Sequence, residues 1–224
     1  MNKYDVIIIG AGPSGIFCAY ELMRQKPDMK VLMIEKGRSI EKRQCPKRTT
    51  KVCVGCKPCS ITTGFAGAGA FSDGKLSLSP DVGGTLPEIL GYEKAEELIK
   101  EADNIYLKFG ADEKVYGIDD YEAIERIRAK AIRANLKLIE CPIRHLGTEE
   151  GYKIYTRLQE HLLASGVEIK FMTMVQDIII EDGVAKGVVT DKEETYYADE
   201  IVSGIGREGS SWFEGICKNH GIKT

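Results

Sequence analysis

Glycines with a characteristic spacing follow the first apolar run of the chain. The β-branched run Val6–Ile9 leads into Gly10, Gly12 and Gly15, which form a G-x-G-x-x-G arrangement. In such a turn the first glycine permits a sharp bend, the second lets backbone approach a pyrophosphate, and the third lets the next helix pack on the strand. A helix predicted over residues 16–25 would direct its positive N-terminal end at the phosphates. The predicted phosphate-binding residues are Gly10, Gly12, Pro13, Ser14 and Gly15.

An acidic residue stands where the sugar of a dinucleotide would need it. The second apolar run, Val31–Ile34, ends at Glu35, twenty positions after Gly15. A carboxylate there is placed to accept hydrogen bonds from ribose hydroxyls. A glutamate disfavours a 2′-phosphate at this position, although Lys36 is adjacent and is a further candidate for cofactor binding. The alternative is a tight turn with no ligand, which the strand–helix–acid context disfavours.

Basic residues cluster between positions 36 and 51. One interpretation is that some of them reach back to cofactor phosphates or cover the adenine end, with Arg43 best placed to do so. The other interpretation is a solvated loop. The basic stretch is also the one feature that favours flavin-dependent RNA modification as a function. The formal net charge of the chain is -3, which weakens that hypothesis.

Four of the seven cysteines of the chain lie close together in the sequence. Cys53, Cys56 and Cys59 form C-x-x-C-x-x-C, and Cys45 precedes them. Four thiolates could enclose one ion, as an iron–sulfur cluster or a zinc site. A Cys-x-x-Cys dithiol and unrelated thiols are the alternatives. We expect a metal-binding or redox cluster, although Thr63 stands where the next cysteine of an iron–sulfur motif would be.

A second glycine-rich stretch extends from Thr63 to Leu76. Small residues at this density favour neither helix nor strand, and they let backbone lie against a ligand and donate N–H groups to it. A flexible loop is the alternative. Phe65, Phe71 and Leu76 would tether the stretch to a core.

The composition indicates a globular protein without the positive charge that is typical of nucleic-acid-binding proteins. The chain has 224 residues, 43% of them hydrophobic, which is enough for one large domain. No leader sequence or membrane-spanning apolar run is evident, so a cytoplasmic location without membrane attachment is expected. The expected partners are a small-molecule substrate or an electron carrier, and not nucleic acid.

The remaining elements follow from hydrophobic periodicity. Helices are predicted over 87–110, from 119 or 120 to 135, and over 152–165, with Ile124 and Ile127 of the second among the expected core residues. The predicted strands cover 136–139, 167–171, 174–181, 184–190, 194–198 and 200–207. No acid, base or nucleophile is assigned. The candidates are Asp73, Lys75, Arg144 and His145.

These elements predict an α/β, Rossmann-like FAD/NAD(P)-binding domain with a parallel sheet, a three-stranded β-meander and a helical insertion. We expect one FAD-binding domain over residues 1–224. Its core would cover about 1–44 and 136–224, and the cysteine- and glycine-rich and helical insertion about 45–135.

The order of the elements resembles the FAD-binding domain of the glutathione-reductase-like flavoproteins. The residues that carry the resemblance are the Gly10–Gly15 loop, Glu35, Val175, and Gly204–Arg207 as a Gly-x-Gly-Arg motif. The stretch Cys45–Leu78 is similar to a narrower group, the poorly characterised predicted FAD-dependent dehydrogenases of bacteria and archaea.

The resemblance implies an FAD-dependent oxidoreductase and assigns roles to individual residues. The Gly10–Gly15 loop would hold the pyrophosphate, Glu35 the adenosine ribose, backbone at Val175 the adenine, and Gly204 would lie near the cofactor. The loop of Ser72, Asp73, Gly74 and Lys75 would approach the isoalloxazine or the ribityl chain. An NAD(P)-binding dehydrogenase and a non-catalytic metal- or nucleotide-binding module remain the alternatives.

Proteins of this kind usually continue past the Gly-x-Gly-Arg strand. They pass through a substrate domain to a later Gly-Asp segment that contacts the ribityl chain and the pyrophosphate. Nothing after Arg207 supplies that segment. We therefore expect the chain to be the N-terminal part of a longer architecture, completed by a C-terminal domain or a second subunit.

Overall fold

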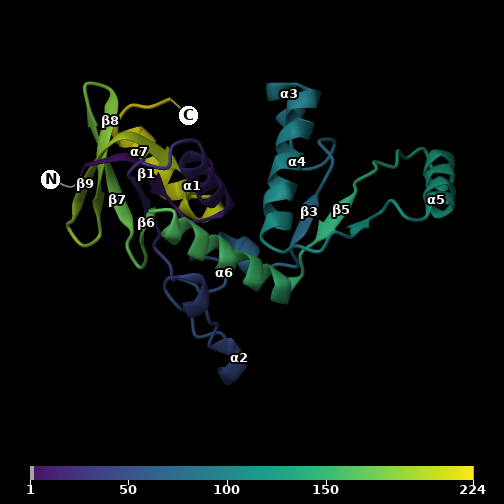
Figure 1. The fold of residues 1–224 in the computed structure, drawn as a ribbon, viewed down its shortest axis with the longest axis horizontal. Coiled ribbons are helices and arrows are strands. Elements are labelled where there is room, and N and C mark those ends of the chain that lie inside the picture. Colours follow the sequence, from purple (N-terminus) through teal and green to yellow (C-terminus); the bar gives the residue numbers. More distant parts are fainter. Residues whose placement is uncertain (1–2, 224) are drawn as a thin grey trace. The chain divides into compact units, whose positions relative to one another are not determined.

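The structure is a computed structural model, and it describes residues 3–223. The chain divides into two compact units (Figure 1). The first comprises Met1–Phe71 and Tyr155–Thr224, and the second comprises Ser72–Ile154.

The first unit contains a six-stranded sheet in the order β6-β2-β1-β9-β8-β7. Its strands are β1 (Lys3–Ile9), β2 (Val31–Ile34), β6 (Glu168–Lys170), β7 (Val175–Glu181), β8 (Val184–Thr190) and β9 (Thr195–Ser203). The pairs β6–β2, β2–β1 and β1–β9 are parallel, whereas β9–β8 and β8–β7 are antiparallel. The predicted α/β fold with a parallel sheet and a meander is confirmed.

Side chains on the two faces of the sheet pack against different helices. Ile7 and Ile9 of β1 belong to one buried cluster together with Ile216 of α7 (Ser210–Asn219). Ile8 points to the other face, because side chains alternate along a strand, and it lies beside Gly15 of α1 (Pro13–Gln25). Because β1 is covered on both faces at residues 6–9, its sequence there is a continuous apolar run rather than an alternating one.

The remaining helices of this part of the chain are short, apart from α6 (Thr148–Ala164), which crosses from the second unit into the first. They are α2 (Lys47–Thr50) and the single 3-10 turns η1 (Ile40–Lys42), η2 (Gly67–Phe71) and η3 (Arg207–Gly209).

One strand takes the place of two that the sequence predicts. The third meander strand (194–198) and the buried strand (200–207) are a single continuous strand, β9. Its first residues pair with β8, as Tyr197 does with Gly187, and its later residues pair with β1, as Ser203 does with Ile9. One edge of β9 pairs with β8 and the other edge pairs with β1, and the two paired stretches overlap.

The second unit is built on a small antiparallel sheet in the order β3-β5-β4. Its elements are β3 (Lys75–Ser77), α3 (Leu86–Leu90), α4 (Tyr92–Lys108), β4 (Val115–Tyr116), α5 (Tyr121–Arg133) and β5 (Ile143–His145). The prediction of a strand over 136–139 is wrong: the strand of this region lies at β5, after Cys141 and Pro142. Residues 136–139 belong to no strand of the described chain.

The prediction that the apolar stripe of α5 is core is also wrong. No residue of this helix is buried, and Ile127 is 53% exposed. In contrast, α4 buries Ala95 and Tyr106. Hydrophobic periodicity identifies a helix with an apolar side, but it does not determine what that side contacts.

A buried ion pair ties α4 to β5. The Arg144 guanidinium binds Asp103 through two nitrogens, with Nη2 at 2.8 Å from Oδ2, and Nη1 donates to the Asp112 carbonyl at 2.6 Å. The two side chains are only 5% and 12% exposed. Arg144 is therefore a structural residue of the second unit.

None of the helices described between residues 3 and 223 has the length and apolar character needed to cross a bilayer.

Replacement of Arg144 by Met is expected to destabilise the second unit, because the Asp103 carboxylate would remain buried without its cation. Loss of one partner of a buried pair costs about 3–5 kcal/mol of unfolding free energy. Thermal and chemical unfolding monitored by circular dichroism measure the change. In the same unit, Lys153→Met removes an exposed pair with Glu150 and should cost less than about 1 kcal/mol. Equal, small effects of both substitutions would contradict this account.

Candidate functional site

The first unit contains a cavity of about 660 Å³ at the carboxyl ends of β1, β2 and β9. This volume lies within the range of cofactor and small-molecule sites, and the edge is where open α/β sheets bind their ligands. Many of the sequence-predicted site residues line the cavity. They are Gly10, Gly12, Pro13, Ser14, Glu35, Lys36, Val175 and Gly204.

Close backbone approaches explain the glycines of the first loop. A Cβ atom on Gly10 would lie 2.8 Å from the Gly204 carbonyl oxygen, and one on Gly15 would lie 2.0 Å from the Gly10 carbonyl oxygen. Gly10 also has a φ of +96°. Gly12 differs, because a Cβ atom there would approach only the Gly204 oxygen, at 3.9 Å. Glycine at positions 10 and 15 is required by the fold, whereas Gly12 keeps the cavity open.

The start of α1 presents the backbone donors of its first turn beside this opening. Gly12 is the N-cap residue and Pro13 occupies the first turn, where its missing N–H is not needed. The Ile16 N–H donates to the Gly12 carbonyl at 3.0 Å. The N–H groups of Ser14 and Gly15 precede it in the first turn, where amides have no intrahelical acceptor. Such a helix start favours a phosphate or another anion.

The Glu35 carboxylate connects the loops that follow β1 and β2. Its Oε2 accepts from the Ala11 N–H and its Oε1 accepts from the Gly37 N–H, both at 2.8 Å. The residue is 5% exposed and lines the cavity. A carboxylate offers about four lone-pair positions, so two remain for further donors such as sugar hydroxyls.

The second glycine-rich stretch forms an adjoining wall of the cavity. The Ala66 N–H donates to the Ala11 carbonyl at 2.7 Å, and a Cβ on Gly67 would lie 3.4 Å from the Gly12 Cα. Thr62, Thr63, Gly64, Gly67 and Ala68 line the cavity. Two glycine-rich backbones therefore lie side by side at the site.

Arg43 holds this second wall in place and does not line the cavity. Nε donates to the Ser60 carbonyl at 3.0 Å, Nη2 to Ile61 at 2.6 Å, and Nη1 to Phe65 and Gly67 at 2.6 and 2.7 Å. Burial lowers the pKa of the Arg43 guanidinium to about 10, so the group remains cationic at neutral pH. The expectation that Arg43 reaches cofactor phosphates is corrected, because its donors are engaged by the carbonyls of the loop.

Charged and aromatic residues complete the rim. Lys36 forms an ion pair with Glu208 of η3, and partial burial lowers the pKa of the Lys36 amine. Trp212 also lines the cavity, and its Nε1 donates to the Gln176 carbonyl at 2.8 Å. The sequence patterns do not single out Glu208 or Trp212. The one sequence feature that could have indicated them is their position within five residues after the Gly-x-Gly-Arg motif.

The cysteines do not form a metal centre in the part of the chain that the structure describes. Among residues 3–223, no three Cys, His, Asp or Glu side chains are grouped so that they could hold a metal ion. All of the cysteines are free thiols, and Cys53 and Cys59 are exposed. The predicted site of Cys45, Cys53, Cys56 and Cys59 is corrected accordingly. Close spacing in sequence alone does not group thiols around one point.

Cys59 has a distinct environment beside the cavity wall. Hydrogen bonds from the backbone N–H groups of Thr62 and Ile61 and from the Thr62 hydroxyl lower the pKa of its thiol, with a contribution from the Arg43 charge. The Thr63 N–H donates to the Cys59 carbonyl at 2.9 Å. An exposed thiol with a lowered pKa is a reactive one.

The predicted loop of Ser72, Asp73, Gly74 and Lys75 belongs to the second unit. There Asp73 bridges two basic side chains, with Oδ1 at 2.8 Å from His145 Nε2 and Oδ2 at 3.0 Å from Lys75 Nζ. These contacts lower the pKa of the Asp73 carboxyl. Its role beside a flavin stays a prediction.

Residues 5–212 match the DAO family, which is described as FAD dependent oxidoreductase. The chain belongs to the FAD-dependent oxidoreductase family. The cavity, the glycine loop and Glu35 all lie within the matched residues.

Solved structures of low sequence identity share the fold. They include THI4 from Thermovibrio ammonificans (13% identity, TM-score 0.52), glycine oxidase from Geobacillus kaustophilus (14%, 0.56) and 3-ketosteroid-delta4-(5alpha)-dehydrogenase from Rhodococcus jostii RHA1 (17%, 0.55). The matches cover 99%, 100% and 90% of this chain but 64%, 60% and 45% of those chains, respectively.

A short stretch of the chain is also similar in sequence to a known protein. A stretch of 33 residues is 52% identical to thiamine thiazole synthase of Coprinopsis cinerea, and it represents 15% of this chain and 10% of that protein. The chain therefore spans less than two thirds of the length of these relatives.

Replacement of Arg43 by Met should loosen the second wall, because four carbonyl groups would lose their donor. Hydrogen–deuterium exchange of residues 60–70 is expected to rise, and any FAD binding to weaken. Arg38→Met provides the control. The Arg38 side chain is exposed, and the substitution keeps the backbone carbonyl of residue 38, which accepts the Phe65 N–H. An exchange pattern that is the same in both variants would contradict the assigned role of Arg43.

Substitution of Thr62 by Val is expected to raise the pKa of Cys59, because it removes a hydroxyl that favours the thiolate. The pH dependence of iodoacetamide alkylation at Cys59, monitored by mass spectrometry, should move to higher pH. Thr50→Val removes a hydroxyl that donates to backbone carbonyls elsewhere and should leave the profile in place. An unmoved profile in T62V would show that the Thr62 hydroxyl does not act on the thiol.

Proposed function

We propose that the cavity of the first unit is the FAD site and that this chain is the FAD-binding part of an oxidoreductase. One observation carries the proposal: Gly12 lines the cavity, and its missing side chain leaves space there and not in the protein core. A glycine whose Cβ would touch nothing closer than 3.9 Å is not needed for packing. It is needed when a ligand lies against the backbone.

The residues around the cavity fit the groups of FAD. The Ser14 and Gly15 amides at the start of α1 would bind the pyrophosphate. Glu35 would accept hydrogen bonds from the adenosine ribose through the lone pairs that Ala11 and Gly37 leave free. Val175 lines the cavity at the start of β7, in support of its proposed place beside the adenine. When bound, FAD supplies hydride- or electron-transfer chemistry.

The contribution of the protein is to position the cofactor and to limit its contact with water. Arg43 fixes the wall formed by residues 60–67, and this wall adjoins the Gly10–Gly15 loop. The Lys36–Glu208 pair and Trp212 line the rim. A wall made of backbone has few side-chain rotamers to order when the ligand binds, so the entropic cost of binding is small.

We further propose that the complete activity requires more protein than this chain contains, from another segment or a subunit. The support is the length of the relatives, of which the chain spans 45% to 64% among the solved structures. Within the family, the Cys45–Leu78 stretch favours the predicted FAD-dependent dehydrogenases. The partner in the reaction would be a small-molecule substrate or an electron carrier.

Gly12→Ala tests the site without disturbing the fold. The added methyl has room in the protein, because the φ of −74° suits alanine, but it occupies the proposed pyrophosphate position. We expect an unchanged circular dichroism spectrum and an FAD Kd raised by ~10-fold or more, equivalent to about 1.4 kcal/mol. Quenching of Trp212, the single tryptophan of the chain, provides the titration signal.

Two further glycine variants make the result interpretable. Gly151→Ala adds a methyl where nothing lies within 4 Å and should leave FAD binding unchanged. Gly15→Ala places a methyl 2.0 Å from the Gly10 oxygen and should disrupt the fold as well as binding. Competition with NADH distinguishes the two dinucleotides. FAD binding by G12A at wild-type affinity, or a wild-type chain that takes up NADH and not FAD, would overturn the proposal.

A further inference from the structure

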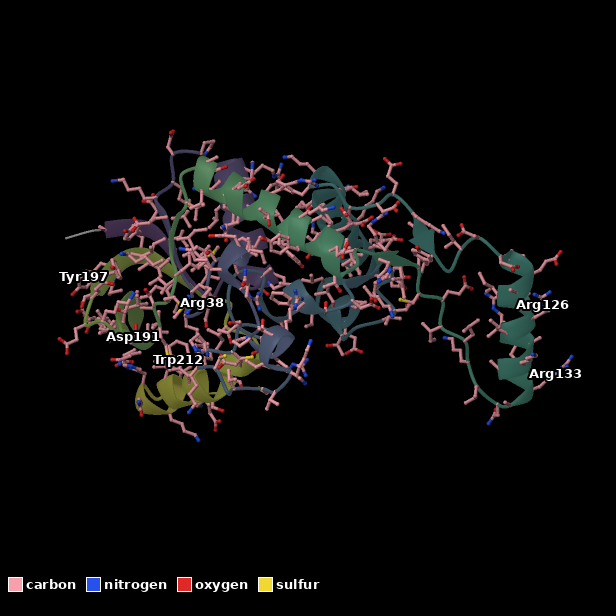
Figure 2. All side chains as sticks on the ribbon, turned by 90° about the horizontal axis from the view of Figure 1, so that it is seen from below. Arg38, Arg126, Arg133, Asp191, Tyr197 and Trp212 are labelled. Carbon is pink, nitrogen blue, oxygen red and sulfur yellow. The ribbon has the colours of Figure 1, made fainter. Side chains whose placement is uncertain are left out.

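Helix α5 of the second unit carries a basic stripe on one face, and apolar side chains on its other faces are exposed. Arg126, Lys130 and Arg133 are exposed and share one face at i, i+4 and i+7 spacing. Within residues 3–223 none of the three has an ion-pair partner. Figure 2 shows Arg126 and Arg133 projecting from the helix. Ile127 and Ile132 are 53% and 67% exposed.

A helix in this state lacks the packing that usually stabilises a helix of its length. It has 13 residues, and none of them is buried. Isolated helices shorter than ~12–15 residues are marginal in water, and most helical stability in proteins comes from a packed apolar face. The Asp120 side chain caps the first turn by accepting from the Ala123 N–H at 2.8 Å, but a cap adds only about 1 kcal/mol.

A complementary surface exists on the same unit. Glu93, Glu97 and Glu101 are exposed on one face of α4 at i, i+4 and i+8 spacing. Glu97 forms an ion pair with Lys94 at 2.8 Å, whereas Glu93 and Glu101 form none within the described part of the chain. Exposed apolar side chains flank this acidic stripe at its N-terminal end, where Ile89 of α3 is 74% exposed and Tyr92 is 50% exposed.

The two stripes match in length as well as in sign. At 1.5 Å per residue, the basic stripe spans about 10 Å and the acidic stripe about 12 Å along their helices. We propose that α5 docks on the α3–α4 surface of a second copy of this chain. In a two-fold dimer each chain gives its α5 and receives that of its partner, so that the contact forms twice.

The charges of α5 disfavour an anionic membrane as the occupant. Asp119, Asp120, Glu122 and Glu125 lie at the start of the helix beside its exposed Tyr121. Carboxylates in that position would be repelled by acidic lipid headgroups. They are compatible with a protein surface that also carries basic residues, such as Lys94 and Lys100 of α4.

Reciprocal charge reversal tests the pairing. Sedimentation or light-scattering measurements should give a dimer for the wild-type chain at low ionic strength, which weakens as salt is added. The variant R126E/R133E places two acidic stripes opposite each other, and E93K/E101K places two basic stripes opposite each other. Both variants are expected to be monomeric. An equimolar mixture of the two should recover a heterodimer, because each α5 then faces a stripe of opposite charge.

Controls test whether net charge, misfolding or membrane binding explains the result. K26E/K186E makes the same change in net charge as R126E/R133E, at exposed sites outside the second unit, and should remain dimeric. Circular dichroism verifies that every variant is folded. A wild-type chain that is monomeric at all concentrations, or a mixture that does not reassociate, overturns the proposal. Binding of a monomeric wild-type chain to phosphatidylserine vesicles, abolished by R126E/R133E, would identify a membrane in place of a second copy.

Discussion

The cavity depends on one buried carboxylate. Glu35 holds together two loops that leave adjacent parallel strands, because its oxygens accept from Ala11 of one loop and Gly37 of the other. A buried N–H without an acceptor costs about 1–3 kcal/mol, so the loss of this carboxylate would leave both loops unsatisfied. The positive charges of Lys36 and Arg43 are near enough to interact favourably with it. The same group therefore organises the walls of the site and offers free lone pairs to a ligand.

Close backbone contacts extend this arrangement to the neighbouring loops. Gly10 meets Gly204, and a Cβ on Gly37 would lie 2.4 Å from the Gly64 nitrogen. Loops after three strands and the second glycine-rich stretch thus converge without side chains between them. Peptide groups of these loops therefore form part of the cavity wall. These groups suit phosphates and sugars, whose oxygen atoms need donors and acceptors at fixed positions.

The predicted site residues that the structure brings to the cavity are those whose position depends on local sequence. The glycine spacing and the acid at the end of β2 single out Gly12 and Glu35, and both line the cavity, since strand, turn and helix are consecutive in the chain. A contact with the ligand is a reasonable expectation for a cation such as Arg43, yet its partners are carbonyls of the loop at residues 60–67. Which acceptor a cation finds depends on how a distant loop folds back, and sequence spacing carries no information on that point. The cysteines illustrate the same limit, because their close spacing in sequence does not group them into a metal site among the described residues.

Helices α4 and α5 show the corresponding limit for the fold. Both have a helical apolar period, which predicts a core position for each, but α4 buries Ala95 and Tyr106 whereas α5 buries nothing. The charged sides of the two helices separate them better than the apolar sides do. Among its exposed positions α4 concentrates glutamates, and α5 concentrates arginine and lysine. An apolar face exposed to water is costly, and a surface of opposite charge is the contact that we propose for α5. The charges of an exposed helix therefore indicate the charge of a protein surface that could bind it.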